Sequence, residues 1–498
     1  MTLPSQGIAR DALLTQLERY KGRDVDWKGG RTFAYTYDPG AEAMAVGKIA
    51  FASFLTENAL DPTVYPSLMR LENEIVGICA SHLNLPAGGV GTFTSGGTES
   101  ILLAVKSARD IARATRPEVT RPNMVMPVTA HAAFHKAAAY FDVALVLVEV
   151  DAVTFRVDPD ALDAAIDEQT VLVVASSPGY AHGVMDPIAA IAARCHARGM
   201  LFHVDACVGG WMLPFWRRLQ AAEGVPAAAQ IPEFDFALPG VTSLSVDLHK
   251  YGFCPKGASV VLFRTPELRA AAQFSCSNWT GYTVVNPSVQ SSKSGGPLAG
   301  AWSVLHVLGD AGYLDITKQL RDATIALLAG ISAIEGLEIM GSPEMCLFAF
   351  TSEDVDVFHV ADEMKERGWY IQPQLSHVGP TGQRYPGNVH LSLNSAGTLA
   401  RVPAFLADLR EAVVAARQLP DVRPDAELGA MLAAASETAL SGEEIAGMLS
   451  LVGVAVGAEG AELPTRMAAI NRMLDAMPPK MEEAVLGGFM SSLYAPTR

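Results

Sequence analysis

Cysteine and positive charge are both scarce in this sequence. Six cysteines occur among 498 residues, at irregular spacing and without a Cys-x-x-Cys pair. This pattern disfavours a disulfide framework and indicates reduced thiols in a cytoplasmic protein. Lysine and arginine number 37 against 53 aspartate and glutamate residues, which gives a formal net charge of −16. The excess of acid argues against nucleic acid or an anionic membrane surface as the main partner.

Long apolar runs are absent as well. No stretch reaches the roughly 18 residues that a membrane span requires, and Met448–Ala458 is too short. The first ten residues lack the apolar core of a secretion signal, so we expect neither a leader nor a transmembrane anchor. Half of the residues are hydrophobic and only 18% are charged, which is typical of a folded globular chain. A chain of this length is expected to form two or three domains.

A lysine near the middle of the chain follows a short, mostly apolar segment. Lys250 comes directly after His249 and the predicted strand residues 242–248. Burying an unpaired ammonium is costly, so a purely structural role explains this position poorly. In enzymes that use pyridoxal phosphate (PLP), a lysine holds the cofactor as a Schiff base and an acidic group partners the pyridine nitrogen. The alternative is an ordinary surface lysine after a strand.

A glycine turn precedes one of the predicted helices. Gly96 and Gly97 lie in the segment 91–100, and the helix is expected to begin at Thr98. Glycine lets the backbone approach a ligand closely, while the free amides and the positive dipole end of a helix suit a phosphate group. The turn therefore predicts a phosphate site, with an ordinary helix cap as the alternative.

Apolar segments alternate with helical ones in the first half of the chain. We expect strands at 125–129, 144–150, 171–176 and 201–205, and helices at 131–140, 159–167 and 186–198. Such alternation predicts βαβ units and a mainly parallel sheet with helices on both faces. Ligands bind outside the carboxyl ends of the strands in these sheets. His131, Asp205, His249 and Lys250 each fall at such an end.

Two of these residues have specific expected partners. Asp205 closes the apolar strand 201–205, and a buried carboxylate needs a partner. The N–H of a pyridinium ring would serve, and a helix cap or a structural salt bridge is the alternative. His131 could lie flat against such a ring, although a lone histidine is also suited to capping a helix.

Several motifs together resemble those of the sphingosine-1-phosphate lyase family. They occupy residues 93–102, 131–134, 182–187, 203–210 and 249–257, with further similarity at 24–28 and 491–494. The wider group II PLP-dependent decarboxylases share the glycine turn, the histidine, the aspartate and the His-Lys pair. The resemblance covers nearly the whole chain. It implies an α/β fold of the PLP-dependent transferase type I class, like aspartate aminotransferase, with a mainly parallel central sheet and a smaller α+β C-terminal domain.

The order of the predicted helices and strands indicates a domain organisation. Residues 1–60 would form an N-terminal helical segment and 61–312 a large PLP-binding domain. Residues 313–424 would form the small α+β domain, and 425–498 a helical tail. The residues 278–282 and 291–296 are expected to form a polar, glycine-containing loop region, with a helix beginning near Leu298.

The resemblance implies a role for four residues at the reaction centre. Lys250 would bind PLP covalently, Asp205 would pair with the pyridine nitrogen, and His131 would stack on the ring. Lys256 would lie near the substrate, where it would contact the substrate phosphate or assist proton transfer. No metal is expected.

A second group of residues would hold the cofactor phosphate and complete the site. The residues expected at the phosphate are Gly96, Gly97, Thr98 and His249. Ser292 and Gly295 belong to the loop 292–296, which would reach the site of the neighbouring subunit in a homodimer.

The implied substrate is a small phosphorylated amine. The family reaction cleaves a phosphorylated long-chain amino alcohol between C2 and C3 by a retro-aldol step, giving a fatty aldehyde and phosphoethanolamine. PLP accepts the electron pair, while the protein orients the breaking bond. An amino-acid decarboxylase of group II is the first alternative, and a non-catalytic protein with the same fold is the second.

The sequence departs from the family pattern where the substrate would bind. Asp61 stands where the family has histidine, and Phe253 where it has tyrosine. Each lost hydrogen bond to a charged group is worth roughly 1.5–3 kcal/mol, enough to change the preferred substrate. Lys256, Lys293 and His135 are the residues that could compensate.

Overall fold

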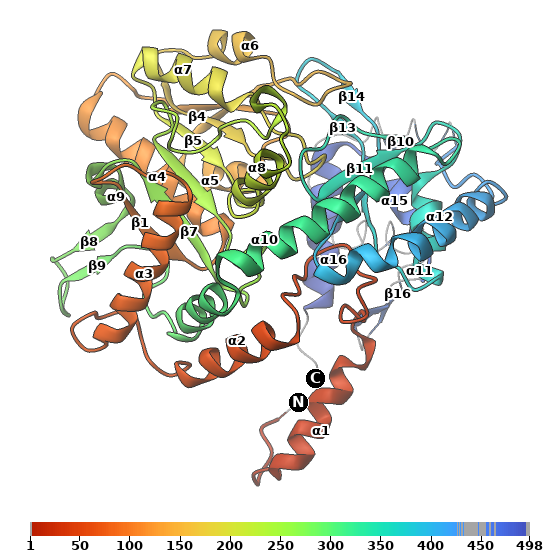
Figure 1. The fold of residues 1–498 in the computed structure, drawn as a ribbon, viewed down its shortest axis with the longest axis horizontal. Helices are drawn as coiled ribbons and strands as arrows, with labels where there is room; N and C mark the ends of the chain where they lie inside the picture. The colour runs from red at the N-terminus through yellow and green to blue at the C-terminus, as the bar shows by residue number, and fades with distance from the viewer. Residues whose placement is uncertain are drawn as a thin grey trace.

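The chain folds into a large lobe and a smaller lobe, each built on its own β-sheet (Figure 1). The computed structural model describes residues 2–425 and 465–494, the positions 427, 429, 432 and 447, and the segments 455–457 and 460–462. Among these residues, no helix is long and apolar enough to cross a membrane.

Seven strands form the sheet of the large lobe, in the order β1-β7-β6-β5-β4-β2-β3. Their bounds are β1 Val90–Thr94, β2 Asn123–Pro127, β3 Ala144–Val148, β4 Thr170–Ser176, β5 Phe202–Asp205, β6 Ser243–Val246 and β7 Ser259–Phe263. Only β7 runs antiparallel to its neighbours, β1 and β6. Strands β4, β5, β6 and β7 are buried along their whole length, as expected for a sheet covered on both faces. The predicted mainly parallel sheet is confirmed.

Helices connect the strands and cover the sheet (Figure 1). They are α3 Pro66–His82, α4 Gly97–Thr115, α5 Ala132–Phe141, α6 Pro159–Ala164, α7 Ile188–Arg198, α8 Leu213–Ala222 and α9 Pro266–Ala272. Helix α4 packs against α5 and α9 and buries an apolar stripe that includes Ile101, Leu102 and Val105. Because α4 starts directly after β1, its N-terminus lies at an end of the sheet.

One long helix, α10 (Gly296–Ser332), runs from the large lobe to the small one (Figure 1). The sequence predicted an end near Gly309–Gly312 and a new helix from Tyr313. Gly309 does leave helical geometry, with φ of 57°, a left-handed conformation that glycine adopts without penalty. A kink at this residue separates two helical segments, so the helix end predicted near Gly309–Gly312 is confirmed, and the second segment continues to Ser332. The expected domain boundary between residues 312 and 313 lies three residues after the kink, and the division into domains stays a prediction.

The small lobe contains a four-stranded antiparallel sheet in the order β10-β11-β15-β12. The bounds are β10 Glu338–Ile339, β11 Leu347–Thr351, β12 Gln372–Gln374 and β15 Asn388–Ser392, with the helices α11 Val357–Glu366 and α12 Val402–Ala416. The hairpin β13–β14 (His377–Val378 and Arg384–Tyr385) projects from this lobe. The strand predicted at 369–372 begins only at Gln372, although Tyr370 forms an isolated parallel bridge with Thr32.

The described parts of the C-terminal tail dock on the small lobe. Helix α15 (Ala468–Asp475) packs against α11, and the Asp362 carboxylate accepts from the amides of Met467 and Ala468 at 2.8 and 2.9 Å. Helix α16 (Pro479–Leu493) follows. Helices α15 and α16 lie within the tail that was expected to be helical, whereas β16 (Ala455–Gly457) and β17 (Gly460–Glu462) form a hairpin that was not predicted. The rest of 426–464 and the residues 495–498 lie outside the described residues.

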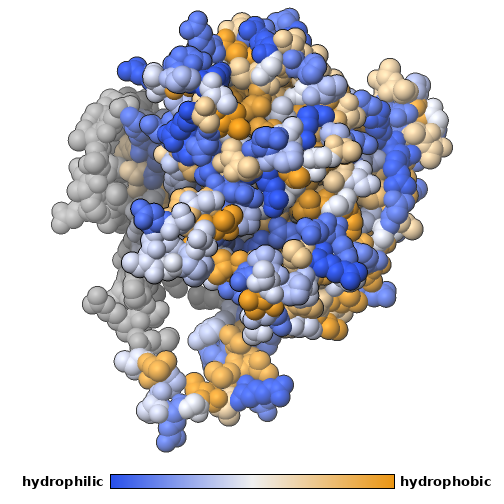
Figure 2. All heavy atoms as spheres, turned by 90° about the vertical axis from the view of Figure 1, so that its left-hand side faces the viewer, coloured by the Kyte–Doolittle hydropathy of each residue, from blue (hydrophilic) through white to orange (hydrophobic). Residues whose placement is uncertain are grey.

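Two elements expose many apolar side chains. Helix α1 (Arg10–Tyr20) projects from the body of the molecule without a buried residue, and α2 (Ala41–Ser53) packs along α10 (Figure 1). The strands β8 (Phe274–Cys276) and β9 (Val284–Asn286) form a hairpin that was not predicted. The predicted loop residues 278–282 lie between these two strands. The face on that side of the molecule mixes hydrophobic and hydrophilic residues (Figure 2).

Candidate active site

Most of the predicted site residues line one cavity, of about 380 Å³, at the carboxyl ends of β4, β5 and β6. Its walls come from the turn before α4, the start of α5, and the segments after these three strands. The lining includes Gly96, Gly97, Thr98, His131, Asp205, His249 and Lys250. Since parallel strands bring their carboxyl ends to one edge of the sheet, residues far apart in sequence meet here.

Asp205 ends β5 and is almost completely buried, with 7% of its surface exposed. Both of its hydrogen bonds go to Oδ1, which accepts from the amide of Cys207 at 3.0 Å and from the hydroxyl of Ser245 at 3.4 Å. Oδ2 forms no hydrogen bond within the described part of the chain. The carboxylate is therefore held in place by one oxygen and leaves the other for a ligand in the cavity.

Lys250 has a partner that the sequence analysis missed, Asp247. The ammonium Nζ of Lys250 lies 3.0 Å from Asp247 Oδ2, and only 2% of the Asp247 side chain is exposed. Burial lowers the pKa of Lys250, but the charge and hydrogen bond of Asp247, together with Cys207 and Tyr37, raise that pKa above its ordinary value. The second oxygen, Asp247 Oδ1, is buried and has no hydrogen-bond partner among the described residues. The spacing of three residues between Asp247 and Lys250 was the available signal.

Asp247 should control how readily Lys250 reacts with an aldehyde. We expect Asp247→Asn to bring the Lys250 pKa down, because burial then acts on the amine without an opposing charge. A larger fraction of the amine is neutral and nucleophilic at neutral pH, so covalent attachment of PLP to the cofactor-free protein becomes faster there. Stopped-flow absorbance across a pH series measures the rate. The buried Asp235→Asn provides the control, and an unchanged pH dependence in Asp247→Asn would contradict this role.

The turn before α4 is shaped by two close approaches. A Cβ on Gly97 would come within 2.7 Å of Cys207 Sγ and 2.8 Å of Asp247 Oδ2, so a side chain cannot fit. The first amides of a helix have no partner within it and carry the positive end of the helix dipole. The amides at Gly97 and Thr98 thus face the cavity edge where an anion would be stabilised.

Glu99, which was not predicted as a functional residue, ties this turn to a distant loop. Its Oε2 accepts from the amide and the hydroxyl of Ser95 at 2.6 and 2.7 Å. Its Oε1 accepts from the amides of Val289 and Gln290 at 2.7 and 3.3 Å. Glu99 is 6% exposed, so one buried carboxylate fixes both the glycine turn and the segment that leads to Ser292.

His131 caps helix α5 and also lines the cavity. Its Nδ1 accepts from the amide of Ala133 at 3.1 Å, which is the capping role considered as the alternative. Because Nδ1 accepts, the proton of a neutral ring lies on Nε2. Tyr180, also missed by the sequence analysis, meets His131 edge to face at 6.4 Å and donates to Gln372 Oε1 at 2.8 Å. Burial raises the pKa of Tyr180 to about 12.

His249 and Lys256 lie close to Lys250. Nδ1 of His249 accepts from the amide of Ala258 at 3.2 Å, and burial lowers the pKa of its ring. Lys256 does not line the cavity, but its Nζ lies 3.4 Å from the carbonyl oxygen of His249 and 4.9 Å from the ring centre of Tyr37. The surrounding protein and the nearby charge of Lys250 lower the pKa of Lys256 to about 8.

Ser292 and Gly295 do not line the cavity of their own chain. Ser292 Oγ accepts from Asn58 Nδ2 at 3.4 Å, and the amide of Gly295 donates to the carbonyl of Glu57 at 2.9 Å. Neighbouring Lys293, considered as a compensating cation, instead pairs with Glu72 at 3.2 Å and donates to the carbonyl of Phe93 at 3.4 Å. Lys293 therefore stabilises the loop rather than offering a free charge.

The residues present fit PLP. The cavity combines an amine for the aldehyde, a carboxylate oxygen without a partner for the pyridine nitrogen, and the N-terminus of a 19-residue helix for the phosphate. The absence of a side chain at Gly97 leaves room beside the Asp247 carboxylate. The described residues contain no group of three or more His, Cys, Asp or Glu side chains placed to hold a metal ion.

Two family models match the chain. The pyridoxal-dependent decarboxylase conserved domain matches residues 26–353, which include every residue of the cavity. A putative helix-turn-helix domain found at the C-terminus of pyridoxal-dependent enzymes matches residues 426–492.

Curated relatives are similar over most of the chain. A sphingosine-1-phosphate lyase of Arabidopsis thaliana is 38% identical over 429 residues, which cover 84% of this chain and 74% of the relative. Sphingosine-1-phosphate lyase 1 of Rattus norvegicus is 34% identical, with 85% of this chain and 71% of the relative covered.

Solved structures agree with the fold. A sphingosine-1-phosphate lyase of Burkholderia pseudomallei superimposes with a TM-score of 0.77 at 36% identity, covering 84% of this chain and 93% of that chain. A glutamate decarboxylase of Lactobacillus brevis has a TM-score of 0.70 at 21% identity, covering 84% and 97%. The predicted type I fold of PLP-dependent enzymes is thereby confirmed.

Proposed function

The chain belongs to the sphingosine-1-phosphate lyase family of pyridoxal-dependent enzymes, and from this membership we propose its reaction. It cleaves the bond between C2 and C3 of a phosphorylated long-chain amino alcohol, releasing a fatty aldehyde and phosphoethanolamine. The observation that carries this proposal is the single cavity that brings Lys250 and Asp205 together with the glycine turn. Relatives named for the same activity match the chain over most of its length.

The proposal assigns the cofactor to residues of this cavity. When bound, PLP supplies an electron-accepting ring that stabilises the pair left by the breaking carbon–carbon bond. Lys250 would hold the cofactor aldehyde, and Asp205 would keep a proton on the pyridine nitrogen. The amides of Gly97 and Thr98 and the ring of His249 would bind the phosphate.

The remaining residues of the cavity position the substrate and move protons. His131 presents its ring to the cavity from a helix cap that fixes its orientation. Lys250 lies in the cavity lining and would be the amine placed to exchange a proton at the substrate. Asp247, 3.0 Å away, favours the protonated state of that amine. These roles follow from location and charge, and they are tested by the substitutions described below.

Lys256 is proposed as the cation that meets the substrate phosphate. The pKa of about 8 means that its side chain is charged below pH 8 and neutral above it. We expect kcat/KM for the phosphorylated substrate to fall as pH rises through this value, because the free enzyme loses its attraction for the anion. In Lys256→Met this limb of the profile should disappear and KM should rise at neutral pH.

Steady-state kinetics between pH 6 and 10 measure both quantities. Lys106→Met serves as the control, because Lys106 is mostly buried and pairs with Asp110 far from the cavity lining. If kcat instead increases through pH 8 and loses that increase in Lys256→Met, Lys256 acts as a base and the binding role is wrong.

The proposal includes a homodimer with active sites at the subunit interface. Ser292 and Gly295 would then contribute to the site of the partner. Support comes from apolar side chains exposed close to this loop in the sequence, since contiguous exposed apolar surface marks interaction sites. These side chains are Phe274 (55% exposed), Trp279 (49%), Tyr282 (61%), Val285 (53%) and Val289 (62%). We also propose a cytoplasmic setting, supported by six cysteines that are all free.

Product analysis tests the proposed reaction. Purified protein loaded with PLP is incubated with a phosphorylated long-chain amino alcohol, and aldehyde and phosphoethanolamine are quantified. Equal amounts of both are expected. Release of carbon dioxide from amino acids, without cleavage of the phosphorylated substrate, would identify a decarboxylase instead.

A further inference from the structure

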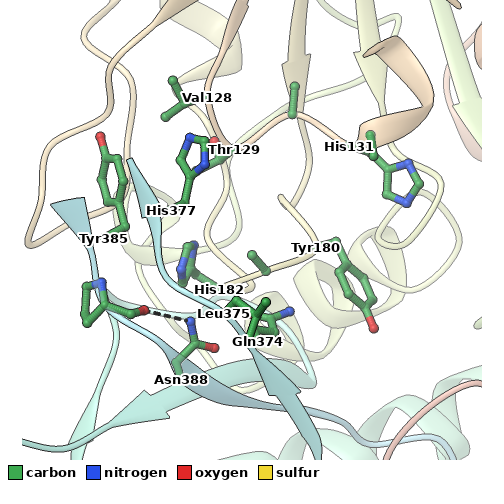
Figure 3. A pocket seen from close by; sticks show the side chains of 14 residues that line it. Val128, Thr129, His131, Tyr180, His182, Gln374, Leu375, His377, Tyr385 and Asn388 are labelled. Atoms are coloured by element: carbon green, nitrogen blue, oxygen red, sulfur yellow. Dashed lines mark hydrogen bonds between the residues drawn. The ribbon is translucent and has the colours of Figure 1, made fainter. Parts of the chain in front are cut away.

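A second cavity, of about 340 Å³, adjoins the cofactor cavity and has no role in the scheme above. The two cavities share His131 and Tyr180 in their walls. In Figure 3 these two residues lie on one side of the second cavity, while His377 and Tyr385 lie on the opposite side. A molecule bound at the cofactor could therefore extend past His131 and Tyr180 into this space.

The wall of the second cavity comes from both lobes. The large lobe contributes the turn before α5 (128–132) and the segment 180–182, and the small lobe contributes residues 374–388 around β12 to β15. Leu375, Pro386, Val128 and Ala132 supply apolar surface. The position between lobes is one where small-molecule sites commonly form, and the volume is within the range of such sites.

Among the residues that the structure describes, none in this lining carries a carboxylate, ammonium or guanidinium group. Burial lowers the pKa of His182 to about 4, so this imidazole is neutral at physiological pH. A phosphate would lose its hydration without gaining a cation here, which is unfavourable. An uncharged, mainly apolar group gains free energy from the same surface.

Several polar groups of the lining already have protein partners. Tyr385 donates to Glu149 Oε2 at 2.7 Å, Tyr180 donates to Gln372 Oε1 at 2.8 Å, and Asn388 Nδ2 donates to the carbonyl of Pro386 at 3.3 Å. The rings of the two tyrosines are thus left as apolar surface. Asn388 Oδ1 is buried without a partner among the described residues, and a hydroxyl on a bound chain would find an acceptor there.

We propose that this cavity between the lobes binds the hydrocarbon chain of the substrate, the part that leaves as the aldehyde. The inference rests on the proposed function, because it names where one half of that substrate lies. The phosphorylated half of the substrate would lie near Lys256. This lysine supplies a second positive charge close to Lys250. The part of the cavity wall that the small lobe supplies would then determine which lengths of hydrocarbon chain fit.

Filling the cavity tests this assignment. Leu375→Trp adds volume from the small lobe, and Val378→Trp adds the same side chain at a position that is 52% exposed and outside the lining. We compare a long-chain phosphorylated amino alcohol with an analogue whose chain has only a few carbons. Leu375→Trp should lower kcat/KM for the long substrate about tenfold or more, since excluding two buried methylenes has this effect.

The short analogue should be cleaved within about twofold of the wild-type rate by Leu375→Trp, and Val378→Trp should be near wild type on both substrates. Inhibition by a long-chain fatty aldehyde should weaken in Leu375→Trp by a factor similar to that for the long substrate. Ala132→Phe, which fills the cavity from the large lobe, should show the same selectivity. Ala132→Phe replaces Leu375→Trp as the test if Leu375→Trp does not fold. The thermal transition and the cofactor absorbance of Leu375→Trp show whether it folds.

Two results would contradict the proposal that the second cavity binds the hydrocarbon chain of the substrate, and they would do so in different ways. Equal effects on the long and short substrates, or no effect on either, would reject the cavity as the chain site while leaving the lyase reaction intact. If the wild-type protein cleaves neither substrate, the proposed function fails and the chain site fails with it. The wild-type reaction separates these two failures.

Discussion

Lys250→Ala is expected to abolish turnover and the yellow absorbance of covalently bound PLP together. The variant loses the only amine in the cavity lining, so neither attachment of the cofactor nor proton exchange at the substrate can proceed. A positioned acid–base group alone contributes about 10²–10⁴-fold, and loss of the covalent link adds to this, so we expect activity to fall about 10⁴-fold or more. Absorbance spectra and aldehyde release from the same preparation measure both effects.

Lys106→Ala is the matched control for this substitution. Lys106 is also mostly buried, donates to carbonyls of Ala271 and Gln273 at 2.8 Å, and lies outside the cavity lining. Its removal should lower stability without removing the cofactor absorbance. If the covalent absorbance persists in Lys250→Ala, another lysine holds the cofactor and the site has been placed wrongly.

Asp205→Asn is the second change with a large expected effect. The amide oxygen of asparagine can still accept from the Cys207 amide, so the cavity should keep its shape. The negative charge that would hold a proton on the pyridine nitrogen is lost, and the ring becomes a weaker electron acceptor. We expect turnover to fall about 10²–10³-fold, the usual loss when one preorganised electrostatic contact is removed.

Cofactor binding separates this effect from misfolding. Asp205→Asn should still form the covalent link at Lys250, with a changed absorbance spectrum, because Lys250 and the phosphate site are intact. Asp235→Asn removes a charge from another buried aspartate, which accepts from the Ala237 amide at 2.8 Å and does not line the cavity. It should show wild-type turnover in the folded fraction. Wild-type turnover in Asp205→Asn would rule out the proposed role.

The sequence predicted the centre of the site because strand geometry determines it. Asp205, His249 and Lys250 each follow an apolar segment, and parallel strands place such positions at one edge of the sheet. No knowledge of side-chain packing was needed for this step. The glycine turn was predictable for a similar reason, since a helix start and two glycines are local features.

Other features depended on contacts that sequence order does not reveal. Asp247 was read as part of the apolar segment, yet β6 ends at Val246 and the chain turns back so that Asp247 pairs with Lys250. Lys293 was considered as a free cation, but Glu72, 221 residues away, neutralises it. The β8–β9 hairpin was missed because two strands of three residues leave too short a pattern of alternation.

The placement of Ser292 and Gly295 could not be predicted or tested within one chain. Both were expected to act across a subunit interface, and in their own chain they contact the loop around residues 57–58. Glu99 connects this segment to the glycine turn through buried hydrogen bonds. A partner subunit would therefore influence the phosphate site through a rigid connection.

Reduction of the PLP-loaded protein with borohydride, followed by peptide mass mapping, tests the central claim most directly. Reduction makes the bond between cofactor and lysine permanent, so the mass of the cofactor marks the residue that holds it. We expect the label on the peptide that contains Lys250, and Asp205→Asn should be labelled at the same residue. Labelling at Lys256, or at no lysine of the cavity, would show that Lys250 does not hold the cofactor.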